Sequence, residues 1–329
     1  MITIGIKALN EERRIGEALA HALRAVEPFA GRVVLADSGS ADRTVAIARD
    51  FPVRIVQLAH AGERCCGAGA QLAFQYADTE FFYMQDGDMA LRPGFLGAAV
   101  AYLRDHPDVA AVGGHVVERM VDSEEFQIRA ATQRLEAHRA PGVVDRLDGG
   151  GLYRVEAVGQ AGFFADRNLH AFEEFDLAAR LHAAGWKLAR IDVPAVDHYG
   201  HAVGGYRLMW RRFASGYAAG AGEVLRAAIG KKHLGFVLRR LRHIRHALVV
   251  IAWWVALAAT ALWLPPALIV LVAGPLLFLW WRRGSLRLAT YSAAYWNVGA
   301  IGLLKGVFRP RLSPTLPLDA VDLSHPRNH

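Results

Sequence analysis

The chain has 329 residues, 53% hydrophobic and 21% charged; this length suits about two structural units, and the composition excludes a disordered chain. Its two cysteines, Cys65 and Cys66, are adjacent, which excludes a disulfide scaffold and a four-cysteine zinc site. The net charge is +7, but residues 231–329 carry 13 Lys and Arg against 2 Asp and Glu, and residues 1–230 carry 25 against 29. The basic character therefore belongs to the last third, and we expect no nucleic-acid partner.

Strands alternate with helices in the first part of the chain. The pattern predicts strands at 2–6, 33–36, 53–57 and 81–84, and helices at 11–23, 42–49 and 67–76. Asn10 is the expected N-cap of the first helix. The alternation indicates an α/β, Rossmann-like fold with a mostly parallel sheet, in which ligands bind beyond the carboxyl ends of the strands.

The following segment is less regular. Strands are expected at 108–112, 150–154 and 188–193, and a helix at 172–184. Gly185 suits the position after that helix. Pro194 is expected to stop the last strand, because proline has no amide hydrogen for a sheet ladder.

Residues 247–281 contain no charged side chain and are interrupted by Pro265 and Pro266. A membrane-spanning helix needs about 20 apolar residues, and proline breaks a helix. We therefore expect a membrane hairpin of two helices, 247–264 and 267–281, either spanning or re-entrant. A buried hairpin of a soluble protein is the alternative, which the tryptophans near the helix ends disfavour.

Basic segments flank this hairpin. Residues 230–246 are expected to lie on anionic membrane lipids, although a solvated helix face fits the same pattern. Residues 288–304 are expected to form an interfacial helix or a third span. The start of the chain has no apolar leader and the flanks are basic, so we expect a catalytic domain facing the cytoplasm on the inner membrane. The expected division is 1–215 for the catalytic domain, 216–246 for juxtamembrane helices, 247–308 for the membrane region and 309–329 for an irregular tail.

Acidic residues follow two of the predicted strands. Asp86 and Asp88 come directly after the strand at 81–84, and paired carboxylates suit Mg²⁺ or Mn²⁺, although a plain acidic turn has the same sequence. His198 could complete such a site, or be a polar loop residue. Asp37 ends the strand at 33–36, where it could accept hydrogen bonds from a nucleoside or cap the next helix.

Three carboxylates open the helix predicted at 172–184, namely Glu173, Glu174 and Asp176. The helix dipole stabilises acidic residues in a first turn, so helix stabilisation alone could explain them. The functional alternative is a general base that takes a proton from a hydroxyl nucleophile.

These segments, in this order, resemble family 2 inverting glycosyltransferases of the GT-A fold over residues 2–200. ALNEERRIGEAL resembles the opening strand, loop and helix of that family. LADSGSADRT resembles its nucleotide-contacting segment, and MQDGDM its Asp-x-Asp motif. GGGLYRVEAVGQAGFF resembles its acceptor side, FEEFDLAARLHAAGW its catalytic helix, and PAVDH the strand that ends in histidine.

The resemblance implies a metal-dependent enzyme with a UDP- or GDP-sugar donor and a divalent cation, Mn²⁺ or Mg²⁺. The cation would be held by Asp88, Asp86 and His198. Donor contacts would come from Ala8, Asn10, Glu11, Asp37 and Asp86, with Arg211 and Arg212 on a donor phosphate or a lipid pyrophosphate. Acceptor contacts would come from Gly150, Gly151 and Asp176.

The catalytic base falls on Glu174, where the family usually has aspartate, and Glu173 remains a second candidate. The Gln-x-x-Arg-Trp motif of processive synthases is not evident, which favours transfer of a single sugar. The membrane anchor favours a lipid-linked acceptor in polysaccharide, glycolipid or polyprenyl-phosphate synthesis. A nucleotidyltransferase and a catalytically inactive membrane scaffold are the competing hypotheses.

Overall fold

The computed structural model describes residues 1–119, 137–200 and 205–324. The chain divides into two compact units, one of Met1–Ala202 with Arg311–His329 and one of Val203–Pro310. The first unit gives way to the second after residue 202, earlier than the boundary expected at 215. The reason is that helix α8 (Gly205–Ala214) packs within the second unit, where the Tyr206 ring meets the Tyr291 ring edge-on.

The first unit is built on one mixed sheet with ten described strands in the order β10-β3-β2-β1-β4-β8-β6-β9-β5, and β7 pairs with β9. Strand β1 pairs in parallel with β2 and β4, β2 with β3, and β6 with β9. Strand β8 runs antiparallel between β4 and β6, and β5, β7 and β10 also pair antiparallel with their neighbours. The strands are β1 (Ile2–Ala8), β2 (Arg32–Asp37), β3 (Arg54–Leu58), β4 (Phe81–Asp86), β5 (Met89–Leu91), β6 (Val109–Glu118), β7 (Gly142–Val144), β8 (Gly151–Arg154), β9 (Lys187–His198) and β10 (Ala320–Asp322).

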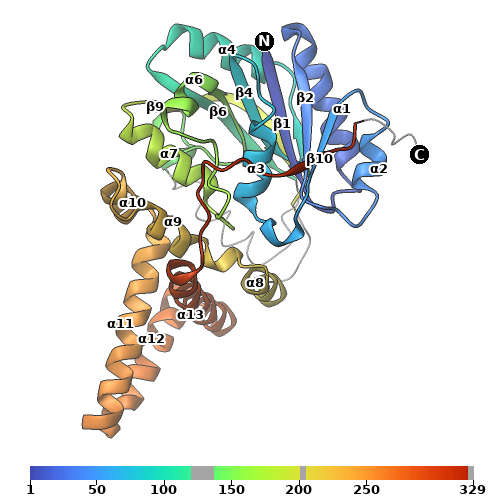
Figure 1. Ribbon diagram of the computed structural model, residues 1–329. Helices are drawn as coiled ribbons and strands as arrows, with labels where there is room; N and C mark the ends of the chain where they lie inside the picture. The colour runs from blue at the N-terminus through green and yellow to red at the C-terminus, as the bar shows by residue number, and fades with distance from the viewer. Residues whose placement is uncertain (120–136, 201–204, 325–329) are drawn as a thin grey trace. The chain divides into compact units, whose positions relative to one another are not determined.

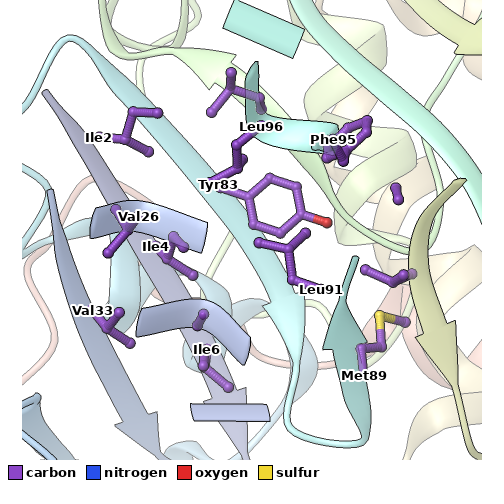
Figure 2. Packing of buried hydrophobic residues seen from close by; sticks show 14 of the residues in the cluster. Ile2, Ile4, Ile6, Val26, Val33, Tyr83, Met89, Leu91, Phe95 and Leu96 are labelled. Atoms are coloured by element: carbon purple, nitrogen blue, oxygen red, sulfur yellow. The ribbon is translucent and has the colours of Figure 1, made fainter. Parts of the chain in front are cut away.

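Helices cover both faces of this sheet (Figure 1). They are α1 (Ile15–Val26), α2 (Thr44–Ala48), α3 (Cys66–Phe74), α4 (Phe95–Asp105), α6 (Val155–Gln160) and α7 (Glu173–Ala183). Because strand side chains alternate between faces, Ile2, Ile4 and Ile6 of β1 enter the core that also contains Val26 of α1 and Tyr83 of β4, as Figure 2 shows. The other face of β1 packs on α3, which leaves Lys7 on that side.

Most predicted strands and helices of the first unit are present, with local corrections. The first helix begins at Ile15, and Asn10 is not its N-cap. Asn10 has a φ of 60°, and its Oδ1 accepts a hydrogen bond from the amide of Ala41, so it joins two loops. The strand expected to stop at Pro194 continues to His198. Pro194 stands opposite His115, where the β6–β9 register shifts, so its missing amide hydrogen falls at an irregular point of the ladder.

The tail expected to be irregular over 309–329 returns to the first unit. Strand β10 pairs antiparallel with β3 (Figure 1). Before it, Leu318 and Gln75 exchange two hydrogen bonds, and the guanidinium of Arg167 donates to the carbonyls of Leu316 and Pro317. The tail lacks the long apolar alternation that predicts a strand, so its order comes from these contacts.

The second unit consists of helices. They are α8, α9 (Gly220–Ala228), α10 (Leu234–Arg240), α11 (Arg242–Trp263), α12 (Leu268–Arg283) and α13 (Leu286–Phe308). Two segments, Arg242–Trp263 and Pro265–Arg283, are long and apolar enough to cross a membrane by length and composition alone, and little of either is buried. The segment expected at 288–304 lies inside α13. There, glycines allow close packing, because a methyl group at Gly302 would lie 2.1 Å from the carbonyl oxygen of Ala218.

Candidate active site

Lys7 lies between two carboxylates at the carboxyl end of the sheet. Its Nζ is 3.1 Å from Asp86 Oδ1 and 2.5 Å from Glu173 Oε1. Asp86 ends β4, and Glu173 begins α7, so the contact joins three elements. Burial lowers the pKa of Lys7, but the two carboxylates outweigh it and hold the pKa well above the usual value. Lys7 is therefore a charged member of this site.

A second group of charges lies around His198 at the end of β9. Its Nδ1 is 2.6 Å from Glu118 Oε2, and its Nε2 is 3.4 Å from Asp88 Oδ2. Burial lowers the pKa of His198, but hydrogen bonds to Asp88 and Glu118 raise it to about 10. Glu11 also belongs here, because a methyl group at Gly87, between Asp86 and Asp88, would lie 3.0 Å from its Cγ. Burial and the charges of Asp88 and Asp86 raise the pKa of Glu11 to about 8. The group is rich in oxygen ligands and negative charge.

Asp88 has the chemistry of a ligand for a divalent cation, and His198 can be the second ligand once its Nε2 gives up its proton, because only a neutral imidazole has a lone pair for a metal. Ligands on adjacent octahedral positions, each about 2.1 Å from Mg²⁺, lie about 3 Å apart, close to the observed Asp88–His198 separation. Within the described residues, no group of three or more His, Cys, Asp and Glu side chains is arranged to hold a metal. Mg²⁺ is commonly bound by one or two protein groups together with waters and phosphates, so the pair fits a cation that is shared with a diphosphate. Asp86, by contrast, is paired with Lys7.

Glu174 lies beside Glu173 but has different surroundings. Its Oε1 accepts a long hydrogen bond, 3.4 Å, from the amide of Gly150. Burial raises its pKa to about 8; Lys7 opposes this, and Glu173 adds to it. A carboxyl group with such a pKa can take and release a proton near neutral pH.

The backbone of Gly150 has no room for a side chain. Its φ is +96°, and a Cβ would lie 2.7 Å from the carbonyl oxygen of Met84 and 3.1 Å from the hydroxyl of Tyr83. Gly151 follows as the first residue of β8 and pairs with Met84. The predicted acceptor segment therefore lies next to the end of β4 and beside Glu174, as expected for one site.

The Asp37 carboxylate is fully buried at the end of β2. It accepts hydrogen bonds from the amides of Gly39 and Ser40, the hydroxyl of Ser40 and the side chain of Gln57. Arg64 holds the same loop by donating to the carbonyls of Ser38 and Gly39. In this structure Asp37 shapes the loop, and direct contact with a donor stays a prediction.

The remaining predicted site residues fall into three places. Ala8 is buried at the end of β1, and Asn10 lies in the loop that follows. Asp176 does not suit an acceptor contact, because its side chain is only 2% exposed and its Oδ2 is 2.8 Å from Arg180 Nε, one helical turn along. Arg211 and Arg212 belong to α8 in the second unit, and their predicted phosphate contacts stay predictions.

Sequence patterns missed Lys7 and Glu118. Lys7 offers a signal in hindsight, since it is a charged residue in an otherwise uncharged strand, ITIGIKA. Glu118 has no such signal, because β6 was expected to end at 112 and extends to Glu118. Their partners in the structure, Glu173 and His198, are remote in the sequence.

Comparison with known proteins gives three findings. Residues 3–162 match the sequence model of the family described as "Glycosyl transferase family 2". No curated protein sequence matches the chain. Among solved structures, the chain is similar to a mannosyltransferase, PcManGT from Pyrobaculum calidifontis, in complex with GDP-Man and Mn²⁺, with 23% identity, a TM-score of 0.61, and coverage of 92% of this chain and 86% of that one.

The chain is also similar to residues 1–349 of TarS from S. aureus in complex with UDP-GlcNAc. The identity is 15% and the TM-score 0.51, over 92% of this chain and 90% of that one. Identities this low show a shared fold. Together with the family match, they confirm the α/β fold of GT-A type that the sequence predicts.

Proposed function

We propose that this chain, whose residues 3–162 form a family 2 glycosyl transferase domain, is a glycosyltransferase that moves one sugar from a UDP- or GDP-sugar to a hydroxyl or phosphate acceptor. One observation carries the proposal: Asp86 at the end of β4, Asp88 just after it, Glu174 on α7 and His198 on β9 lie together at the carboxyl ends of the strands. That edge is where α/β sheets bind ligands.

Glu174 serves as the base in this proposal. It takes the proton from the acceptor hydroxyl, whose oxygen forms a bond to the anomeric carbon as the bond from that carbon to the diphosphate oxygen breaks. The nucleoside diphosphate leaves from the opposite face, which inverts the anomeric configuration. The raised pKa of Glu174, about 8, suits a base that works near neutral pH.

Asp88 and His198 would hold a divalent cation. When bound, such an ion neutralises the charge that grows on the departing diphosphate. Glu11 lies close to these groups, beside Gly87, and Asp37 orders the neighbouring loop at Gly39 and Ser40. The nucleoside would lie against that loop.

The second unit would place the enzyme on the inner membrane, with the catalytic unit on the cytoplasmic side. The two apolar helical segments support this, since little of either is buried within the chain and basic residues stand at Arg242, Arg245, Arg282 and Arg283. A lipid-linked acceptor follows, because holding enzyme and acceptor on one surface raises their effective concentration. Centrifugation of lysed cells and washing with high salt and carbonate test the anchoring; release of the protein into the wash would contradict it.

The activity test uses the full chain purified in detergent, with Mn²⁺ and a panel of UDP- and GDP-sugars. A glycosyltransferase releases nucleoside diphosphate and makes a glycosylated product, whereas a nucleotidyltransferase releases pyrophosphate. Binding without turnover would indicate an inactive scaffold. Glu174→Gln and Asp88→Ala should each lower the rate by about 100-fold or more. The exposed Glu80→Gln is the matched control, and equal loss in that variant would contradict the assigned roles.

A further inference from the structure

We propose that Lys7 is a positioning residue of the transferase site, because its ammonium group holds Asp86 and Glu173 together and leaves Glu174 to serve as the base. The inference rests on the proposed function and adds to it a residue that sequence patterns did not single out. It also assigns different roles to two adjacent glutamates that the sequence could not tell apart.

The register of the sheet places Lys7 beside Asp86. Strands β1 and β4 run parallel, and Lys7 and Asp86 are partners at their carboxyl ends. Side chains at matching positions of neighbouring strands point to the same face. The 3.1 Å contact between Nζ and Oδ1 therefore follows from the backbone pairing of the two strands.

The aliphatic part of Lys7 packs against α3 at a glycine. A methyl group at Gly69 would lie 3.4 Å from Cβ and 4.0 Å from Cδ of Lys7. Only 18% of the Lys7 side chain is exposed. A largely buried ammonium group is costly unless it is paired, and Asp86 and Glu173 supply that pairing.

The same contact sets the two glutamates apart. The Glu173 side chain is 9% exposed, and its Oε1 lies 2.5 Å from Lys7 Nζ. This ion pair occupies the Glu173 carboxylate, so that it is held against Lys7 and not presented to an acceptor. Glu174 instead accepts a long hydrogen bond, 3.4 Å, from the amide of Gly150. Glu174 also lies next to the predicted acceptor segment at Gly150 and Gly151.

Charged and titratable groups from several elements act on Glu174. Lys7 on β1 lowers its pKa, whereas Glu173, Asp86 and Asp148 raise it. Three further groups interact with Glu174 electrostatically, namely Tyr83 on β4, Tyr153 on β8 and Arg190 on β9. Removing the charge of Lys7 must therefore move the Glu174 titration to higher pH, and removing the charge of Glu173 must move it to lower pH.

The experiment measures the rate of sugar transfer against pH for the full chain in detergent, with saturating nucleotide sugar and Mn²⁺. Lys7→Met keeps the length of the side chain without its charge. It should lower kcat/KM by about 10-fold or more near pH 7, since the carboxylates lose their positions. It should also move the acid limb of the profile, which is the fall in rate at low pH, to a pH about 1 unit or more higher. Lys7→Arg keeps the charge and should return the limb toward its wild-type position.

Two further variants complete the design. Lys187→Met removes an exposed lysine that is 2.7 Å from Asp108, and should leave rate and profile unchanged. Glu173→Gln should move the acid limb to lower pH, opposite to Lys7→Met, and it tests the inference even if Lys7→Met fails to fold. Melting temperatures of all variants report folding separately from turnover.

The outcomes separate the alternatives. A slow Lys7→Met enzyme with an unshifted acid limb would show a purely structural role and overturn the inference. So would a Lys7→Met enzyme of wild-type rate, or loss of all turnover in Glu173→Gln together with full activity in Glu174→Gln. A wild-type chain that transfers no sugar from any donor would instead refute the proposed function, before any variant is compared.

Discussion

Replacing Glu174 with glutamine tests the ionisation of this side chain through stability, independently of any substrate. Burial, opposed by Lys7 and reinforced by Glu173, raises its pKa from 4.5 to about 8. A carboxyl group whose pKa is higher in the folded state holds its proton more tightly there. Its effect on stability is therefore small below about pH 4.5, and it becomes a growing penalty as the pH rises to about 8. Glutamine resembles the neutral acid and avoids that penalty.

The size of the effect follows from the two pKa values. The difference between 4.5 and about 8 corresponds to at most ~5 kcal/mol. The Glu174 side chain is partly exposed, so screening by solvent reduces this figure. We therefore use about 2 kcal/mol for the loss of unfolding free energy that ionised Glu174 causes. One kcal/mol shifts the melting temperature of a unit of this size by about 2–4 °C. Glu174→Gln should therefore melt about 4–8 °C above wild type near pH 8.5, and within about 2 °C of it near pH 5.

The assay is thermal unfolding of the full chain in detergent at both pH values, followed by intrinsic fluorescence. Glu80→Gln makes the same chemical change at an exposed site and should leave the melting temperature unchanged at both pH values. The reasoning would be refuted if Glu174→Gln melted at or below the wild-type temperature near pH 8.5. An equal gain at both pH values would also refute it, because the gain must come from ionisation.

Three further predictions concern the tail, the helical unit and the cation. Leu318→Ala removes a side chain that is only 4% exposed, so it should destabilise the first unit by about 2–4 kcal/mol and lower its melting temperature. Leu316→Ala, at a side chain that is 51% exposed, should leave the melting temperature unchanged. Equal effects of the two variants would show that the tail is not packed. Gly302→Ala should disrupt the packing of α13, whereas Gly274→Ala meets no atom within 4 Å and serves as control, and limited proteolysis of the helical unit distinguishes them. Treatment with EDTA should abolish sugar transfer and Mn²⁺ or Mg²⁺ should restore it; full activity in the chelator would remove the role given to Asp88.

Much of the site could be predicted because it lies at the ends of regular strands. Asp86 and Asp88 follow a buried apolar strand, and such strands end at one edge of a parallel sheet. The Asp176–Arg180 pair was also open to prediction from its spacing of four residues on a helix. The contact between Lys7 and Glu173 was not, because it joins residues 166 positions apart and depends on how α7 packs beside β1.

Local sequence rules failed where tertiary contacts determine the secondary structure. Pro194 did not end β9, because the paired strand is irregular opposite it. The tail became a strand because β3 offers it a free edge and the side chains of Gln75 and Arg167 hold the preceding residues. Neither outcome could be predicted from the local sequence alone.

The return of the tail makes the first unit discontinuous in sequence, with the helical unit inserted between residues 202 and 311. A fragment cut before the helices would lack β10, and β3 would present a row of unpaired backbone groups along an open edge. Such edges recruit strands from other molecules, so this fragment should aggregate. A version of the first unit without the helices would need a linker in their place, with residues 311–324 kept on the same polypeptide.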